Sequence, residues 1–255
     1  MNNNLITSIS FILLFIFSNN TLTGQRGLTY RQANTFDIMI GGDFGASLIN
    51  GDETNPEVAE ILDRRKKAED FRLSKRFGIN YYHGISERFA LKSGFRFADA
   101  GFSISAVEEF DVEQDINTIN KVSQNNGFNY AYKYQMFEVP LGLKLSLGGG
   151  NCNPYVEFGI SAHLYRQTAV EKSLYKVEGN ELISNNTVFL DEPLSEVNFF
   201  GFISSGGAFS IAGNVQGFSQ LVFRYQLNNL RPESLITEKM INIGLELGVR
   251  YVFKN

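Results

Sequence analysis

The stretch that decides the fold is INIGLELGVRYVF, residues 241–253. A large apolar side chain stands at every second position, and the positions between are mostly small, polar or charged. This period of two is that of a β-strand, in which successive side chains point to opposite faces. Strands of soluble proteins usually have about 5 or 6 residues, whereas a tilted strand needs about 9 to 11 to cross a bilayer. The stretch therefore predicts a membrane-spanning strand.

Seven upstream segments repeat the alternation. They are residues 36–48, 71–81, 89–97, 137–147, 156–165, 197–211 and 220–227, of which 197–211 is the least regular. Eight long strands in one chain predict an all-β fold, a closed antiparallel up-and-down barrel, because closure removes the exposed edges that an open sheet would carry.

The face opposite the apolar one carries the charges of these segments. Seven of its residues are basic and five are acidic: Asp37, Asp43, Arg72, Arg76, Lys92, Arg96, Glu138, Lys144, Glu157, Arg224, Glu246 and Arg250. A soluble barrel would turn this face to water and enclose a large apolar lumen. In a membrane barrel the charges pair in a narrow lumen and the apolar face meets lipid.

The lengths of the connections favour the membrane barrel. Long connections at about 49–70, 106–128, 169–196 and 229–238 alternate with short ones at 83–87, 148–153 and 212–214. Long extracellular loops at one end and short periplasmic turns at the other are typical of outer-membrane barrels. Ten tyrosines near strand ends further suggest aromatic girdles at the membrane interfaces: Tyr30, Tyr81, Tyr82, Tyr130, Tyr132, Tyr134, Tyr155, Tyr165, Tyr225 and Tyr251.

The N-terminus reads as an export signal. Residues 5–17 (LITSISFILLFIF) are apolar, too few for a membrane-spanning helix, and are followed by polar residues and the small Gly24. No Lys or Arg precedes this run, which departs from the usual pattern. We interpret 1–24 as a signal peptide cleaved near Gly24, 25–35 as a short periplasmic segment and 36–255 as the barrel domain, located in the outer membrane.

Two features carry a resemblance to known proteins. The end of the chain, with Gly248, Tyr251 and Phe253, looks like the β-signal by which the barrel-assembly machinery recognises outer-membrane proteins for insertion. Residues 137–145 (FEVPLGLKL) and 153–159 (NPYVEFG) resemble strands of the PorT-like outer-membrane β-barrels of Bacteroidota. That family includes a protein associated with type IX secretion and gliding, so the resemblance implies architecture and location more than a task.

Candidate chemistry is sparse. His163 lies near Glu157 and Tyr165 on the lumenal face, where it acts either as a general base or, more simply, within a hydrogen-bond network. His83 reads as a turn residue, and the one cysteine, Cys152, as an unpaired turn thiol. We therefore expect no enzymatic activity, no cofactor and no metal site. The formal charge of −4 gives no reason to expect nucleic acid as a partner.

These observations favour an outer-membrane barrel with a non-enzymatic structural or interaction role, accessory to type IX secretion or to the cell envelope. Its expected partners are outer-membrane lipid, the barrel-assembly machinery and other envelope or secretion proteins. Two alternatives stay open: a surface adhesin or receptor that binds a ligand through loops 106–128 and 169–196, and a small lipid-modifying barrel enzyme. The helix-like stretch 56–71 is either a docking helix or a solvated helix that caps the barrel mouth.

Overall fold

The computed structural model describes residues 34–106, 108–110, 119–122, 126–148, 152–176, 182–190, 197–230 and 236–253. Eight long strands dominate it: β1 (Thr35–Gly51), β3 (Arg72–Gly84), β4 (Phe89–Ala106), β7 (Asn126–Ser146), β8 (Cys152–Lys176), β10 (Val197–Ala212), β11 (Val215–Gln226) and β12 (Ile236–Val252). The signal peptide 1–24 and all but the last residues of segment 25–35 lie outside the described residues.

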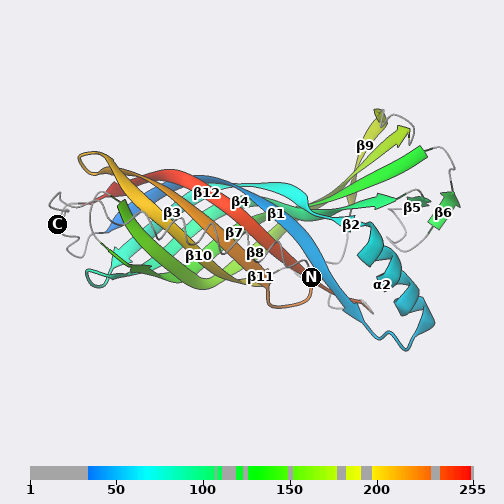
Figure 1. Cartoon of the computed structure of the whole chain (residues 1–255), viewed down its shortest axis with the longest axis horizontal. Coiled ribbons are helices and arrows are strands. Elements are labelled where there is room, and N and C mark those ends of the chain that lie inside the picture. Colours follow the sequence, from blue (N-terminus) through cyan, green and yellow to red (C-terminus); the bar gives the residue numbers. More distant parts are fainter. Residues whose placement is uncertain are drawn as a thin grey trace.

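The eight strands form a closed ring. Each pairs antiparallel with the next long strand of the chain, and β12 returns to β1, with Thr35 opposite Val252 and Gly51 opposite Ile236. The ribbon in Figure 1 shows the resulting cylinder. At the tight β10–β11 connection Gly213 has φ of 53°, a left-handed conformation that glycine adopts without a steric cost.

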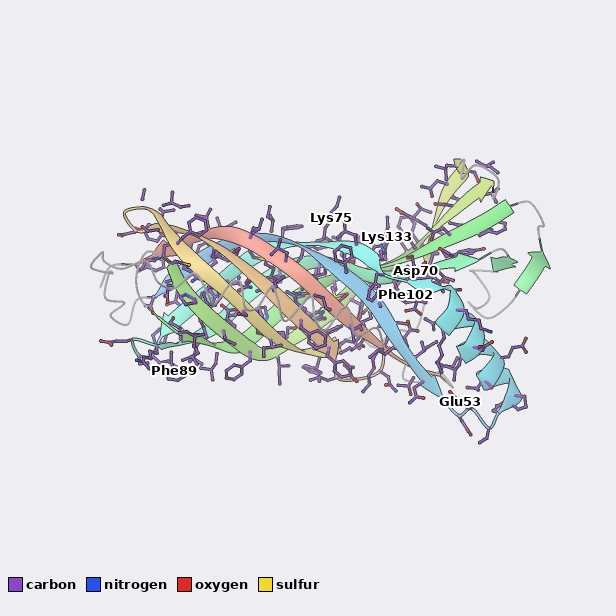
Figure 2. All side chains as sticks on the ribbon, in the orientation of Figure 1. Glu53, Asp70, Lys75, Phe89, Phe102 and Lys133 are labelled. Atoms are coloured by element: carbon purple, nitrogen blue, oxygen red, sulfur yellow. The ribbon has the colours of Figure 1, made fainter. Side chains whose placement is uncertain are left out.

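The alternation sorts side chains between the outside and the lumen as predicted. On β12, Ile243, Leu245, Leu247 and Val249 are each 46–49% exposed, whereas Asn242, Glu246 and Arg250 are at most 2% exposed. The other long strands follow the same rule over the segments that the sequence predicts, so apolar side chains cover the outside of this part of the cylinder (Figure 2). A continuous apolar band of this size is stable only against lipid. The chain is thus an eight-stranded transmembrane β-barrel.

The apolar side chains change face towards one end of the barrel. On β4, Phe95 and Phe97 point outward, but Ala98, Phe102 and Ile104 point inward; on β7 the same reversal separates Phe137 from Met136. A row of polar residues marks the change on the outside, where Lys75, Asp99, Gln135 and Gln167 are successive register partners. Beyond this row β4 and β7 are apolar inside and polar outside, as in a soluble protein, whereas on β3 the outward Leu73 remains 60% exposed.

The prediction that the tyrosines form girdles at the membrane interfaces was wrong for most of them. Tyr82, Tyr130, Tyr132, Tyr134 and Tyr155 are fully buried inside the barrel, and Tyr165 packs in from the lumenal side. Tyr81, Tyr225 and Tyr251 lie on the outward face, and Tyr30 is outside the described residues. The inward tyrosines occupy the lumenal phase of their strands, which nearness to a strand end does not reveal.

The two ends of the barrel differ in structure (Figure 1). One end holds the tight turns; the other, which we call the loop end, carries α2 (Pro56–Ala68), β2 (Glu69–Asp70), β5 (Glu108–Phe110), β6 (Ile119–Val122) and β9 (Leu182–Leu190). The expected loops 106–128 and 169–196 are partly strand, because β7 starts at Asn126 and β8 runs on to Lys176 to pair with β9. No helix in the described ranges is long and apolar enough to span a membrane.

Candidate functional site

The barrel lumen holds the charged residues that the sequence placed on the inward face. Eleven of the twelve are at most 6% exposed; Arg72 is the exception and lies nearer the loop end, half-buried. The eleven come from all eight strands except β10, so closure of the barrel is what brings them together.

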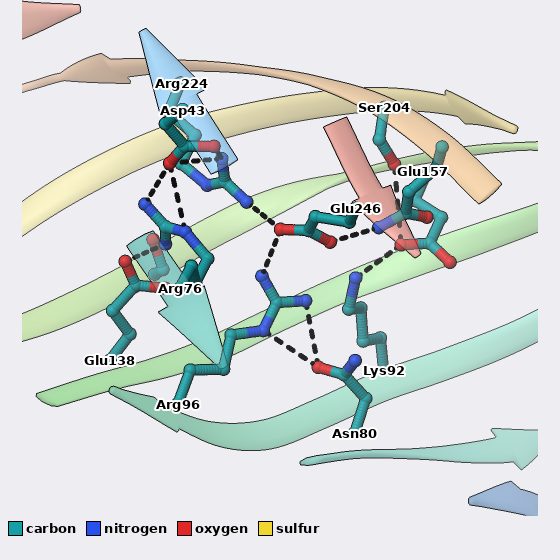
Figure 3. A network of polar contacts seen from close by, with 12 residues as sticks. Asp43, Arg76, Asn80, Lys92, Arg96, Glu138, Glu157, Ser204, Arg224 and Glu246 are labelled. Carbon is teal, nitrogen blue, oxygen red and sulfur yellow. Dashed lines mark hydrogen bonds and ion pairs between the residues drawn. The ribbon is translucent and has the colours of Figure 1, made fainter. Parts of the chain in front are cut away.

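The centre of the lumen is a balanced cluster of three arginines and three carboxylates (Figure 3). The Asp43 carboxylate accepts hydrogen bonds from Arg76 Nε at 3.0 Å and from Arg224 Nη1 at 3.1 Å. Arg76 also pairs with Glu138, and Glu246 pairs with both Arg224 and Arg96. Every charge in this cluster therefore has an opposite partner, which offsets the cost of removing it from water.

Polar residues without charge complete the central cluster. Asn80 Oδ1 accepts hydrogen bonds from Arg96 at 2.9 and 3.0 Å, and Gln220 donates to Glu246. These partners were not singled out in the sequence. Their position in the inward phase of β3 and β11 was the available signal, since buried ion pairs need neutral groups to satisfy the remaining donors and acceptors.

A second layer lies between this cluster and the turn end. Arg250 binds Asp37 through two hydrogen bonds of 2.7 Å, and Lys92 pairs with Glu157. Tyr82 Oη donates to the same Glu157 carboxylate at 2.9 Å. Lys144 differs from its neighbours, because its ammonium lies over the rings of Tyr155 and Tyr82, at 4.2 and 5.0 Å from their centroids.

Arg72 pairs with a carboxylate that the inward pattern did not include. Its Nη2 lies 2.8 Å from Asp99 Oδ2, and its Nη1 donates to the carbonyl of Ala100. Asp99 belongs to the outward polar row of β4, so this ion pair sits at the boundary where the apolar face reverses. The pairing explains one of the two excess basic charges in the sequence count.

Aromatic side chains fill the lumen on the loop-end side of the charges. A buried cluster joins β4, β7, β8, β10 and β12: Ala98, Ala100, Phe102, Ile104, Phe128, Tyr130, Tyr132, Tyr134, Met136, Val170, Phe200, Leu230 and Met240. The rings of Phe102 and Tyr132 stack at 4.9 Å, and Tyr134 meets Tyr165 edge-on at 5.9 Å. This cluster places an apolar layer between the ionic lumen and the loop end.

Helix α2 is fastened over this end rather than projecting freely. Val58 and Leu62 pack with Ile236, and the buried Arg65 bridges Glu238 and Glu69, each with a shortest N–O distance of 3.2 Å. Burial works against the charge of Arg65, but the carboxylates of Glu238 and Glu69 outweigh it and raise the pKa of the guanidinium. Burial also raises the pKa of Glu69, with Arg65 acting in the opposite direction.

His163 is enclosed in the lumen without the geometry of a catalytic relay. Its Nε2 lies 2.7 Å from Ser161 Oγ, and Glu138 approaches that same nitrogen at 3.7 Å. In a catalytic triad the carboxylate holds the opposite ring nitrogen; here Nδ1 faces Met136 Sδ at 2.9 Å. The ring also stacks on Phe200, which fits a packing and hydrogen-bonding role.

The remaining candidate residues lie apart from this site. His83 was expected in a turn but is an exposed residue of β3, opposite Leu91, because β3 continues to Gly84. Cys152 is exposed. Within the described ranges, no group of three or more His, Cys, Asp or Glu side chains is arranged to hold a metal ion.

The residues of the proposed insertion signal lie on both faces of β12. Tyr251 and Phe253 point outward with their rings edge to face at 5.2 Å. Gly248 faces the lumen, where a Cβ atom would come within 2.6 Å of the Phe218 ring and 2.2 Å of the Ile38 carbonyl oxygen. This close packing explains why position 248 is a glycine, whether or not Gly248 is also part of the insertion signal.

Comparison with known proteins finds similar barrels of low sequence identity. No protein-family model and no curated protein matches the chain. Among solved structures it is similar to OprG from Pseudomonas aeruginosa (8% identity, TM-score 0.43, 89% of this chain and 98% of that one). It is also similar to Ail, the attachment invasion locus protein of Yersinia pestis (11%, 0.35, 86% and 99%), and to the outer membrane protease OmpT from Escherichia coli (9%, 0.37, 90% and 99%). Since the names of Ail and OmpT give them different roles, the likeness assigns none to this chain.

Proposed function

We propose that this chain is a non-conducting outer-membrane barrel with a structural or interaction role, exercised by its loop end. The observation that carries the proposal is the filled lumen. Paired charges occupy its centre, an aromatic cluster follows, and Arg65 fastens α2 at the loop end. Eight strands enclose an interior about wide enough for side chains alone, so a continuous water path would require the buried ion pairs to separate.

The loop end offers a surface that suits a protein partner. Leu182, Ile183 and Phe189 of β9 are 47–64% exposed, on a strand whose partner among the described residues is β8 alone. This hairpin stands beyond the outward polar row, so lipid does not account for its apolar side chains. Exposed apolar residues on an unpaired strand edge favour pairing or docking with another chain.

The partner we favour is a protein of the cell envelope or of type IX secretion. The support is the resemblance of residues 137–145 and 153–159 to PorT-like barrels. The structure adds a physical role to these stretches, since Lys144 of the first lies over Tyr155 of the second and Glu157 sits opposite Lys144 in the register. The same exposed hairpin also suits an adhesin or receptor, which is the second candidate.

Site-specific photo-crosslinking in the native envelope tests the proposal. A photoreactive residue at Phe189 is expected to give a discrete adduct with one envelope protein, and the same residue at Phe158 in the lipid-facing band is the matched control. Retention of the adduct in cells grown without any external ligand supports an envelope partner. An adduct that forms only with added host or matrix material favours the adhesin, and no adduct at Phe189 above the Phe158 control contradicts an interaction role for the hairpin.

A further inference from the structure

A small cavity lies at the turn end of the lumen, away from the aromatic cluster. Its volume is about 40 Å³, and its lining includes Thr35, Ser86, Arg88, Lys144, Ser146 and Asn153. These residues come from the start of β1, the β3–β4 turn and the adjoining ends of β7 and β8. Phe89, which also lines the cavity, marks this end of the barrel in Figure 2.

Lys144 brings to the cavity a buried amino group that has no ion pair among the described residues. It is 6% exposed, and within the described part of the chain no carboxylate lies at ion-pair distance from it. The two nearest lumenal carboxylates are taken: Glu157 by Lys92, and Asp37 by Arg250. The six fully lumenal basic residues therefore exceed the five acidic ones by one charge, and the ion pairs assign that excess to Lys144.

Two further buried polar atoms at the cavity have no hydrogen-bond partner in the part of the chain that the structure describes. They are the hydroxyl Oγ1 of Thr35, 6% exposed, and Oδ1 of Asn153, 3% exposed. Buried polar groups nearly always find partners, and rings alone do not replace the counter-charge of a buried ammonium. An ammonium, a hydroxyl and an amide oxygen around one cavity therefore indicate a bound group that the described residues do not supply.

We propose that the cavity binds a small monocarboxylate, of the size of formate or acetate. The single excess charge of Lys144 matches one carboxylate, and Thr35 can donate a second hydrogen bond. The cavity, of about 40 Å³, has room for a small anion as well as for water. Asn153 Oδ1 is an acceptor, so it fits a water molecule retained beside the anion.

The position of Arg88 indicates how an anion reaches the cavity. Arg88 is exposed at the rim of the cavity, beside Glu87 on the same turn. Its positive charge at the surface and that of Lys144 inside draw a small anion inward, whereas Glu87 disfavours larger polyanions at the mouth. The site is thus built for a small, singly charged ligand reaching the barrel from its turn end.

Heat unfolding of the purified barrel in detergent, scored by its gel mobility, tests this inference. Sodium formate at tenfold the dissociation constant is expected to raise the midpoint by about 3 to 6 °C over sodium chloride at equal ionic strength. Lys144→Met is expected to abolish this formate-specific rise, and Lys66→Met, on the exposed face of α2, to keep it. Carbon-13 formate saturation-transfer spectra should report the same loss directly.

A second variant keeps the test decisive if Lys144→Met does not fold. Thr35→Val removes the hydroxyl but not the charge, and is expected to weaken formate binding about tenfold, the effect of one hydrogen bond to a charged group. Three results would each overturn the carboxylate site and leave water as the occupant. They are an equal rise of the unfolding midpoint with chloride, no rise with either salt, and a formate-specific rise that neither variant diminishes.

Discussion

Removal of the Asp43 carboxylate should destabilise the barrel more than any change to a surface ion pair. Asp43 is 1% exposed and accepts hydrogen bonds from Arg76 Nε, from Arg76 Nη2 at 2.5 Å and from Arg224 Nη1. Asp43→Asn keeps the volume and one acceptor oxygen, but leaves three arginines facing two carboxylates. Breaking a buried pair on one side costs about 3 to 5 kcal/mol, and because the amide retains an acceptor we expect about 3 kcal/mol.

The assay is equilibrium unfolding in urea from lipid vesicles. The chain has no Trp, so far-ultraviolet circular dichroism is the suitable signal. Asp63→Asn is the matched control, because Asp63 and Lys67 form an exposed pair on α2 and such pairs contribute about 0.2 to 1 kcal/mol. Equal unfolding free energies for Asp43→Asn and Asp63→Asn would refute the view that the lumenal charges are held as tight ion pairs.

Three further changes test other parts of the account. Leu245→Arg in the outward band should cost about 2 to 4 kcal/mol in vesicles, whereas Lys75→Arg at the outward polar row should be nearly neutral; equal costs would contradict the assigned membrane boundary. Tyr251→Ala with Phe253→Ala should leave export intact but cause accumulation in the periplasm, and normal outer-membrane levels would disprove the insertion signal. Arg65→Met should weaken the attachment of α2, which is measured as faster proteolysis. The increase in proteolysis should be larger at about pH 8 than at about pH 5, because the raised pKa of Glu69 favours its neutral form at low pH and a neutral Glu69 does not need Arg65. An increase that is independent of pH would contradict the role of the Arg65 bridge.

The alternation in the sequence was sufficient to predict the eight long strands and the faces of the predicted segments. Residues 241–253, for example, predict which side chains of β12 lie outside and which lie in the lumen, because a side-chain period of two leaves no other arrangement once one face must meet lipid. The helix at 56–68 could also be predicted from its pattern, whereas its attachment through Arg65 depends on Glu238, which is distant in sequence.

The part that the sequence did not reveal is where the apolar face reverses. Residues 128–136 of β7 alternate as regularly as 137–147, but their apolar side chains point into the barrel. In the neighbouring strand β8, Arg166 is an extra residue between Tyr165 and Gln167, the partners of Met136 and Gln135. This bulge shifts which side chains of β8 face the lumen. Residues 182–190 show no alternation at all, so β9 depends on pairing with β8 and was read as loop.

The pattern also could not predict which charged residues form ion pairs with one another. Twelve charges on one face suggest a network, but the partner of each is set by the stagger of the closed barrel: Arg76 meets Asp43 on the neighbouring strand and Glu138 two strands away. Lys144 forms no ion pair among the described residues although Glu157 is its register partner, because Glu157 pairs with Lys92, and a count of charges alone does not reveal this.

Planar-bilayer recording of the purified protein tests the central claim, a lumen closed by its own side chains, most directly. The account predicts a flat baseline at moderate voltage, with insertion verified in parallel by the gel mobility of the folded barrel. Stable, repeated current steps of porin size from the same preparation would show an open lumen and contradict both the packed ionic interior and the non-conducting role.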